Sequence, residues 1–233
     1  MKNKPVLFLI PTPISPDESP AREVLEILPR IDFFVCERNR TTRRWLRTVL
    51  PDYDIDSHRF FEFDKHRNRF PLDQIKRAWQ DGKTGGLTSE AGTPAVADPG
   101  FGVVAEAHRA GVTVRPLPGN NSLILGLMAS GLNGNQFTYH GYFPIDLQAL
   151  KSQLKSLFQM IEKGYTQIFI ETPYRNRKTL ETLLRLLPAG YRLSVSAGLL
   201  TESEDIRTMT ISEWKTTDTT YLHKTPAVYY IGL

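Results

Sequence analysis

The stretch of this sequence best suited to chemistry is a loop rich in glycine and proline, Ser-Glu-Ala-Gly-Thr-Pro-Ala-Val-Ala-Asp-Pro-Gly, at residues 89–100. It follows a short apolar run at residues 86–89 and precedes a helical pattern around residues 103–110. Glycine lets a backbone approach a ligand closely, and open α/β sheets bind ligands at the carboxyl ends of their strands. An ordinary turn accounts for one glycine and one proline, but hardly for so long a stretch. We therefore expect this loop to bind a ligand.

The common nucleotide-binding motifs are absent from the sequence. A phosphate-binding loop ends in Gly-Lys-Ser/Thr, and a dinucleotide site places Gly-x-Gly-x-x-Gly after the first strand. The predicted first strand, residues 6–10, is instead followed by Pro11-Thr12-Pro13-Ile14. The sequence therefore disfavours ATP or NAD binding of the usual kinds.

Short apolar runs alternate with helical patterns along the chain, which predicts the strands and helices that position these loops. Strands are predicted at residues 6–10, 32–36, 86–89, 112–115, 137–142, 167–171, 193–196, 207–211 and 227–231. Helices are predicted after Ser19 and at residues 45–50, 72–79, 103–110, 122–130, 147–161 and 180–187. The last three strands have only short connections, which favours antiparallel pairing. We predict two α/β domains, residues 1–117 with a mostly parallel sheet and residues 118–233 with a mixed sheet, divided near Pro116-Leu117-Pro118-Gly119.

Composition limits the class of protein. The chain has 233 residues, of which 40% are hydrophobic, so it can bury a core without disulfides. Its single cysteine, Cys36, cannot form an internal disulfide, and no cluster of metal-binding residues predicts a metal. We expect a cytoplasmic protein without a membrane span, because the first apolar run stops at Pro11. A net charge of +4 permits an anionic partner without demonstrating one.

The motifs taken together resemble the tetrapyrrole methylase superfamily, the class III S-adenosylmethionine-dependent methyltransferases. Within it the chain is similar to the group of ribosomal small subunit methyltransferases that modify a cytidine ribose 2′-oxygen of 16S ribosomal RNA. The similarity extends over nearly the whole chain. The matching motifs are Pro11-Thr12-Pro13-Ile14, Cys36-Glu37-Arg38 with Thr41, Ser89 to Gly100, Pro116-Leu117-Pro118-Gly119, Ser130-Gly131-Leu132, Gly141-Tyr142-Phe143-Pro144 and Glu171-Thr172-Pro173-Tyr174-Arg175.

This resemblance implies that S-adenosylmethionine binds in a cleft between the two domains. It implies a homodimer and, as the substrate, ribosomal RNA or the small ribosomal subunit. By position, the cofactor-binding residues are Pro13, Ala91, Gly92, Thr93, Val96, Asn121 and Ser122, with Tyr174, Leu199, Pro226 and Ala227 on the adenine side. Methyl transfer from a sulfonium is an in-line displacement, so the protein must chiefly orient the two reactants and exclude water.

Several residues depart from the family pattern. Ser15-Pro16 stands where Gly-Asn usually follows the first turn, Glu90 replaces an aspartate, and Gly198 replaces an acidic residue. The chain also ends at Leu233, without the C-terminal extension typical of the group. The last two changes bear on the choice of substrate. Two alternatives therefore stay open: a methyltransferase that acts on a tetrapyrrole or another small molecule, and a non-catalytic module that binds S-adenosylmethionine.

A ribose hydroxyl is a poor nucleophile, so a base or a hydrogen-bond acceptor near it would help the reaction. Glu37 follows the second predicted strand at its ligand-facing end, although a salt bridge to Arg38 or Arg43 explains it equally well. Glu90 is a further candidate. His66, in Phe63-Asp64-Lys65-His66-Arg67-Asn68, matches a His/Asn-containing segment of the family, but a lone histidine is more often a solvated loop residue. Glu37 and His66 are our candidate catalytic residues.

Three basic clusters follow predicted strands, around residues 38–47, 65–69 and 175–178. Arg43 and Arg47 lie one helical turn apart and are expected to project together into solvent. Such a stripe can bind RNA phosphates without reading the sequence, although each cluster alone is more often a solubilising surface. We expect five arginines to contact the substrate: Arg38, Arg43, Arg47, Arg67 and Arg175.

Overall fold

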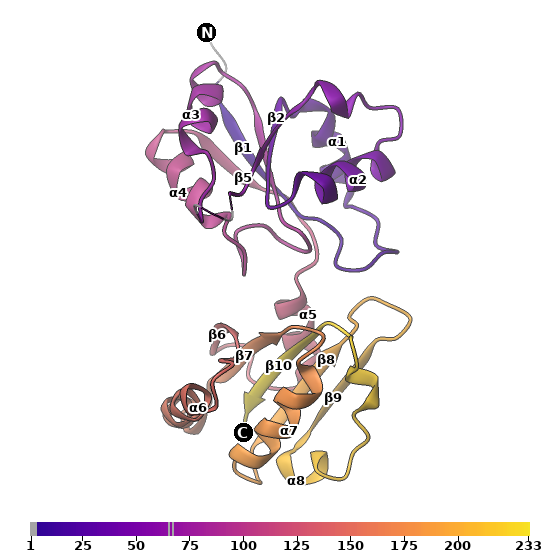
Figure 1. Cartoon of the computed structure of the whole chain (residues 1–233), viewed down its shortest axis with the longest axis vertical. Coiled ribbons are helices and arrows are strands. Elements are labelled where there is room, and N and C mark those ends of the chain that lie inside the picture. The colour runs from indigo at the N-terminus through magenta and orange to yellow at the C-terminus, as the bar shows by residue number, and fades with distance from the viewer. Residues whose placement is uncertain (1–3, 65, 67) are drawn as a thin grey trace. The chain divides into compact units, whose positions relative to one another are not determined.

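The computed structural model describes residues 4–64, 66 and 68–233 of the chain (Figure 1). These residues form two compact units, one that ends at Asn121 and one that spans Ser122–Leu233. The domain limits 1–117 and 118–233 stay a prediction. Each unit contains one five-stranded sheet.

The first unit is built on a parallel sheet with the strand order β3-β2-β4-β1-β5. Its strands are β1 (Val6–Ile10), β2 (Phe33–Cys36), β3 (Arg59–Glu62), β4 (Gly85–Thr88) and β5 (Thr113–Pro116). Its helices are α1 (Arg22–Ile27), α2 (Asn39–Val49), α3 (Leu72–Gln80) and α4 (Phe101–Arg109), with short 3-10 turns η1 (Leu28–Arg30) and η2 (Ile55–Ser57). Because the strands run parallel, the loops that leave their carboxyl ends meet at one edge.

Two apolar cores hold helices on both faces of this sheet, as Figure 1 shows. Leu7, Phe33 and Leu87 of the sheet pack with residues of α3 and α4, whereas Phe8, Ile10 and Phe34 pack with residues of α1 and α2. Strand side chains alternate between the two faces, so β1, β2 and β3 each contribute to both cores. This two-sided burial explains why the strands are short apolar runs rather than alternating patterns.

The second unit carries a mixed sheet with the order β6-β7-β10-β8-β9. Only β6 and β7 pair in parallel, and the other three pairs are antiparallel. Its strands are β6 (Phe137–Tyr142), β7 (Thr166–Glu171), β8 (Arg192–Ala197), β9 (Asp205–Thr210) and β10 (Ala227–Gly232). Its helices are α5 (Ser122–Ser130), α6 (Leu147–Glu162), α7 (Asn176–Leu186) and α8 (Ile211–Trp214), with a 3-10 turn η3 (Thr220–Leu222). The predicted pair of α/β folds, one parallel and one mixed, is confirmed.

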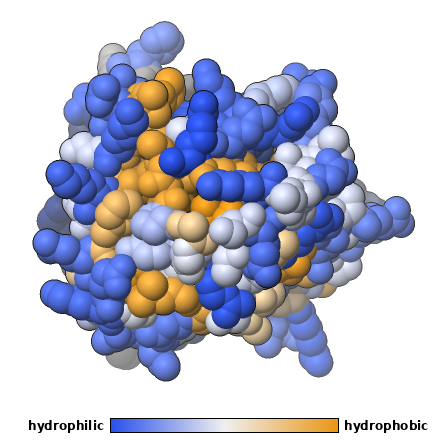
Figure 2. Space-filling model, turned by 90° about the horizontal axis from the view of Figure 1, so that it is seen from below, coloured by the Kyte–Doolittle hydropathy of each residue, from blue (hydrophilic) through white to orange (hydrophobic). Residues whose placement is uncertain are grey.

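Helix α5 covers one face of the second sheet, and residues of α6, α7 and α8 pack on the other. Close contact between α5 and β10 depends on Gly126, because a Cβ there would overlap the Tyr230 hydroxyl. That hydroxyl donates toward the carbonyls of Ser122 and Leu123, each at 3.1 Å. Figure 2 shows one face of the molecule, where apolar side chains form one larger group and smaller ones, surrounded by polar and charged side chains. None of the described helices combines the length and the apolar character that a membrane span requires.

Candidate functional site

The loops that follow β1 and β4 are bound to each other at the carboxyl edge of the first sheet. Thr12 and Gly92 exchange two backbone hydrogen bonds, 3.0 Å from the Thr12 amide and 2.9 Å from the Gly92 amide. The Ser89 hydroxyl donates to the Gly92 carbonyl at 2.7 Å, and the Thr12 hydroxyl donates to the Ser89 carbonyl at 3.2 Å. The two predicted ligand loops therefore form one connected structure.

The loop after β5 joins the same edge. The Leu117 amide donates to the Leu9 carbonyl at 3.0 Å, and a Cβ at Gly119 would overlap Pro11. Beyond it, the Asn121 side-chain amide donates to the Thr93 hydroxyl at 2.5 Å. Sheet order makes this convergence possible, because β1 lies between β4 and β5. Predicted cofactor residues of the first unit thus lie on three adjacent loops: Pro13, Ala91, Gly92, Thr93, Val96 and Asn121.

The loop after β4 holds two non-glycine residues in the left-handed conformation. Ala95 and Ala97 have φ values of 64° and 61°. The Asp98 carboxylate fixes the turn, since one of its oxygens accepts the Ala95 amide at 2.9 Å and the Gly100 amide at 2.6 Å. Val96, between the two alanines, is 45% exposed. Backbone strain of this kind is concentrated at ligand-binding and catalytic loops.

Three carboxylates lie at this edge, and two of them act on the third, Glu37. Burial raises the pKa of Glu37 above its ordinary value, and the negative charges of Asp98 and Glu90 raise it further. Burial also raises the pKa of Asp98, against the opposing effect of its two amide hydrogen bonds. A cation bound here would be favoured by all three groups. The expected salt bridge from Glu37 does not form among the described residues, because Arg38 lies 3.7 Å from Glu90 and Arg43 pairs with Asp56.

His66, the second candidate catalytic residue, lies in the loop after β3 and is exposed to solvent. Its backbone amide donates to the Asp64 carboxylate at 2.9 Å, and Asp64 and Arg69 pair across the base of the loop. The loop leaves the carboxyl end of an edge strand, two strands away from the loop of Glu90. A catalytic role for His66 stays a prediction. Arg67 lies outside the described residues.

The arginines of the first basic cluster differ in exposure, although Arg43 and Arg47 both pair with Asp56, Arg47 at 3.2 Å. Arg38 and Arg47 are 59% and 57% exposed, whereas the Arg43 side chain is only 22% exposed. Arg43 pairs with Asp56 and lies over the Phe60 ring, 4.6 Å from its centroid. Arg43 therefore does not project into solvent beside Arg47 as expected.

The remaining predicted residues lie in the second unit, at the edge where β7 and β8 end and β10 begins. Ala227 pairs with both Glu171 and Ala197, and the Gly198 amide donates to the Pro226 carbonyl at 3.0 Å. This edge carries the four predicted adenine contacts, Tyr174, Leu199, Pro226 and Ala227. Ser122 begins α5.

Arg175, the arginine expected to contact substrate in the second unit, is already engaged within that unit. It lies 3.0 Å from the Glu171 carboxylate and donates to the carbonyls of Phe143 and Pro144 at 3.2 and 3.5 Å. These contacts account for its position without a substrate. Its role in substrate binding stays a prediction.

A cavity of about 410 Å³, which the sequence did not predict, lies beside these loops in the first unit. It opens between the loop after β1, the start of the loop after β4, and helix α2. Among the groups that line it are Ser15, Trp45 and Glu90. The sequence marked Glu90 as a candidate base and Ser15 as a departure from the family pattern, but no spacing rule connects either to Trp45.

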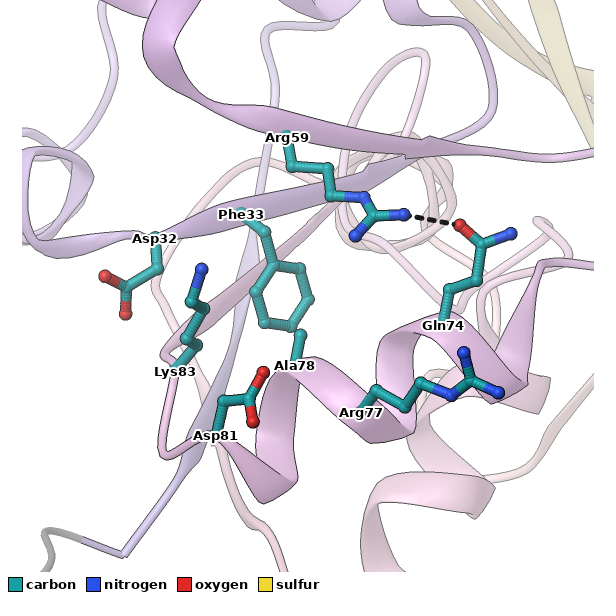
Figure 3. Close-up of a pocket in the computed structure, with 8 residues that line it drawn as sticks. All are labelled: Asp32, Phe33, Arg59, Gln74, Arg77, Ala78, Asp81 and Lys83. Carbon is teal, nitrogen blue, oxygen red and sulfur yellow. Dashed lines mark hydrogen bonds between the residues drawn. The ribbon is translucent and has the colours of Figure 1, made fainter.

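A smaller pocket of about 110 Å³ lies at the opposite edge of the first sheet, near the amino ends of β2 and β3 (Figure 3). Arg59 donates to the Gln74 side chain at 2.7 Å across its mouth. Asp32, Asp81 and Lys83 also line it, so both signs of charge are present and no single class of ligand is favoured. Across the described part of the chain, no group of three or more acidic, histidine or cysteine side chains is arranged to hold a metal ion.

Comparisons with known proteins agree with this architecture. The family model for tetrapyrrole (corrin/porphyrin) methylases matches residues 6–215. A ribosomal RNA small subunit methyltransferase I from Vibrio cholerae serotype O1 is 32% identical over 210 residues, which is 90% of this chain and 70% of that protein.

Two solved structures share the fold. The methyltransferase CobJ superposes with a TM-score of 0.62 at 14% identity, over 99% of this chain and 94% of that one. Uroporphyrin-III-C-methyltransferase from Thermus thermophilus superposes with a TM-score of 0.56 at 16% identity, over 97% and 94% of the two chains. The chain therefore belongs to the tetrapyrrole (corrin/porphyrin) methylases and is a methyltransferase.

Proposed function

We propose that this protein uses S-adenosylmethionine to methylate small-subunit ribosomal RNA, at a ribose 2′-oxygen of the 16S molecule. The observation that carries the proposal is the similarity to a ribosomal RNA small subunit methyltransferase I over 90% of the chain. The proposed site is the carboxyl edge of the first sheet, where the loops after β1, β4 and β5 are bound together.

The chemistry of this edge suits the cofactor. S-adenosylmethionine carries a positive sulfonium, which supplies the methyl group when the cofactor is bound. Glu37, Glu90 and Asp98 lie at this edge, and a cation bound beside them would offset the cost of burying the charges of Glu37 and Asp98, a cost that raises the pKa of both. The strained loop at Ala95 and Ala97 exposes Val96 for apolar contact. On these grounds the cofactor fits the residues present.

The chain's own residues would act on the acceptor hydroxyl. A carboxylate with a raised pKa is a better proton acceptor than an ordinary one, which supports Glu37 as the group that accepts the hydroxyl proton. His66 is exposed to solvent. Glu37 is therefore the stronger candidate of the two, and His66 is kept as the alternative base.

Exposed arginines would hold the RNA by its phosphates. Arg38 and Arg47 are more than half exposed, and both belong to the basic segment that follows β2. Contacts of this kind position an RNA without specifying its sequence. Arg43 would act indirectly, through its packing on Phe60 and its pair with Asp56.

We propose a cytoplasmic protein that forms a homodimer, as the resemblance implies. Sedimentation equilibrium of the purified chain tests the dimer, and a monomer at micromolar concentration would contradict it.

The proposal is tested by transfer of label from S-adenosylmethionine carrying a radioactive methyl group. Three acceptors are compared: small subunits and purified 16S rRNA from a host that lacks this protein, and a uroporphyrinogen. We expect label in RNA and none in the tetrapyrrole. Label in the tetrapyrrole alone would replace the proposal with its small-molecule alternative, and cofactor binding without label in any acceptor would favour the non-catalytic alternative.

A further inference from the structure

The cavity beside α2 has the size and composition of a ligand pocket. Its volume of about 410 Å³ lies within the range of small-molecule sites, roughly 300 to 1,000 Å³. Six of the residues that line it carry polar or charged side chains that bear on its chemistry: Ser15, Thr41, Arg44, Trp45, Thr48 and Glu90.

Three of the residues that line this pocket each carry a polar atom that is buried without a hydrogen-bond partner in the described structure. These atoms are the Ser15 hydroxyl, the Trp45 indole nitrogen and one carboxylate oxygen of Glu90, Oε1. Buried polar groups nearly always have a hydrogen-bond partner, so an unpaired one requires an explanation. Three such atoms around one cavity indicate that a ligand supplies the missing partners.

One oxygen of the Glu90 carboxylate, Oε1, is buried and has no hydrogen-bond partner among the described residues. The other oxygen, Oε2, accepts from the Thr41 hydroxyl at 3.4 Å and lies 3.7 Å from the Arg38 guanidinium. Oε1 can therefore accept a hydrogen bond from a ligand hydroxyl or amine. Trp45 contributes the opposite kind of group, a donor with no acceptor.

Arg44 adds a cation among the lining residues. Its side chain is exposed, and among the described residues no carboxylate pairs with it. An arginine in this position is suited to a phosphate at the entrance of the pocket. The pocket thus presents an unpaired donor, an unpaired carboxylate oxygen and a free guanidinium.

We propose that this pocket binds one nucleotide of the RNA substrate, with its nucleoside on Trp45, Ser15 and Glu90 and its phosphate on Arg44. The inference rests on the proposed function for the identity of the RNA. A ribonucleoside offers both donors and acceptors along with an apolar ring, and single-stranded RNA is recognised through such displaced nucleotides. A purely anionic ligand would be repelled by Glu90, and an apolar one would leave the three atoms unpaired.

The test is to titrate each of the four ribonucleoside 5′-monophosphates with the full chain and to measure binding by ligand-observed NMR. We expect at least one to bind the wild type. Trp45→Phe, which removes the indole N–H but keeps a ring, should raise its dissociation constant about threefold to tenfold. Thr48→Tyr, at an exposed helix position that lines the pocket, should abolish measurable binding by filling it.

Trp79 provides a matched control, because its indole nitrogen is also buried without a partner but it does not line this pocket. Trp79→Phe should leave monophosphate binding unchanged. Absence of binding to the wild type, or equal binding by wild type, Trp45→Phe and Thr48→Tyr, would overturn the inference. This titration needs no methyl transfer, so its result is independent of the labelling experiment. If nucleotides bind to the pocket but no label enters RNA, the proposed reaction is wrong and the nucleotide pocket stands.

Discussion

Thr12 and Gly92 pair through two backbone hydrogen bonds, of 3.0 and 2.9 Å, and so connect the loops that follow the first and fourth strands of the parallel sheet. Gly92 has a φ of 77°, in the left-handed region that favours glycine. A Cβ at this position would also lie 3.2 Å from Cγ2 of Ile14 and 3.4 Å from the Asn120 carbonyl oxygen. Glycine at this position therefore allows three loops to pack against one another, in addition to allowing a ligand to approach.

Replacing Gly92 tests this joint. Gly92→Ala should destabilise the chain by about 1–2 kcal/mol, the cost of left-handed backbone for a residue with a Cβ, and should weaken S-adenosylmethionine binding. Urea unfolding and calorimetric titration of the cofactor measure the two effects. Gly102→Ala is the control: that glycine lies inside α4 with open space around it, so alanine should stabilise by about 0.5–1 kcal/mol. Unchanged cofactor affinity in Gly92→Ala would remove this loop from the proposed site.

The raised pKa of Glu37 predicts a dependence of stability on pH. Because burial raises the pKa of Glu37, the folded state keeps the Glu37 proton to a higher pH than the unfolded state does. Protonated Glu37 therefore stabilises the fold below the ordinary glutamate pKa. This contribution is lost as the pH rises through the raised pKa of the folded state. Glu37→Gln cannot ionise. The variant should therefore gain stability relative to wild type as the pH rises from 4 to 7, measured by urea unfolding at each pH. If the difference in free energy of unfolding between variant and wild type stays constant or falls with pH, Glu37 does not have a raised pKa in the folded protein.

Cys36 should be inert in the native protein. It is fully buried in β2, and burial raises the pKa of its thiol to about 12, so almost no thiolate exists at neutral pH. Labelling with a thiol reagent at pH 8 should occur only when the first unit unfolds. The labelling rate should therefore increase with the concentration of added urea. Rapid labelling in native buffer would contradict the burial of β2.

The contact between Gly126 and Tyr230 fixes α5 on the second sheet. Gly126→Ala would force its methyl group against the Tyr230 hydroxyl and should cost about 1–3 kcal/mol, the usual range for overpacking. Tyr230→Phe removes that hydroxyl together with its two hydrogen bonds to the carbonyls of Ser122 and Leu123. The double variant should be less destabilised than the sum of the single ones, as unfolding of all four proteins would show. Additive effects would mean that the two side chains do not meet.

The sequence was sufficient to predict most of the fold. The helix at residues 122–130 and the strand at residues 137–142 are found with the expected limits. The helix is strongly apolar and is followed by Gly131, whereas the strand is marked by its three aromatic residues. Strand β3 (Arg59–Glu62) was not predicted, since it has four residues at the edge of the sheet and begins and ends with a charged one. Its pairing with β2 supplies stabilisation that a local pattern does not record.

Contacts between distant segments were the part that sequence reasoning missed. Helical spacing placed Arg43 on the solvent side of α2, but Asp56 and Phe60 from later segments contact it. The pocket at Trp45 was missed for the same reason, because Ser15, Trp45 and Glu90 come from three separate segments. The convergence of the three loops was predictable in outline, since parallel strands end at one edge.

The central claim is that this protein methylates small-subunit ribosomal RNA. The most direct measurement is mass spectrometry of 16S rRNA nucleosides from a host that lacks the gene, before and after complementation. We predict one 2′-O-methylated nucleoside that is missing in the deletion, returns with the wild type and does not return with Glu37→Gln. Identical modified nucleosides in the deletion and the complemented host would contradict the account.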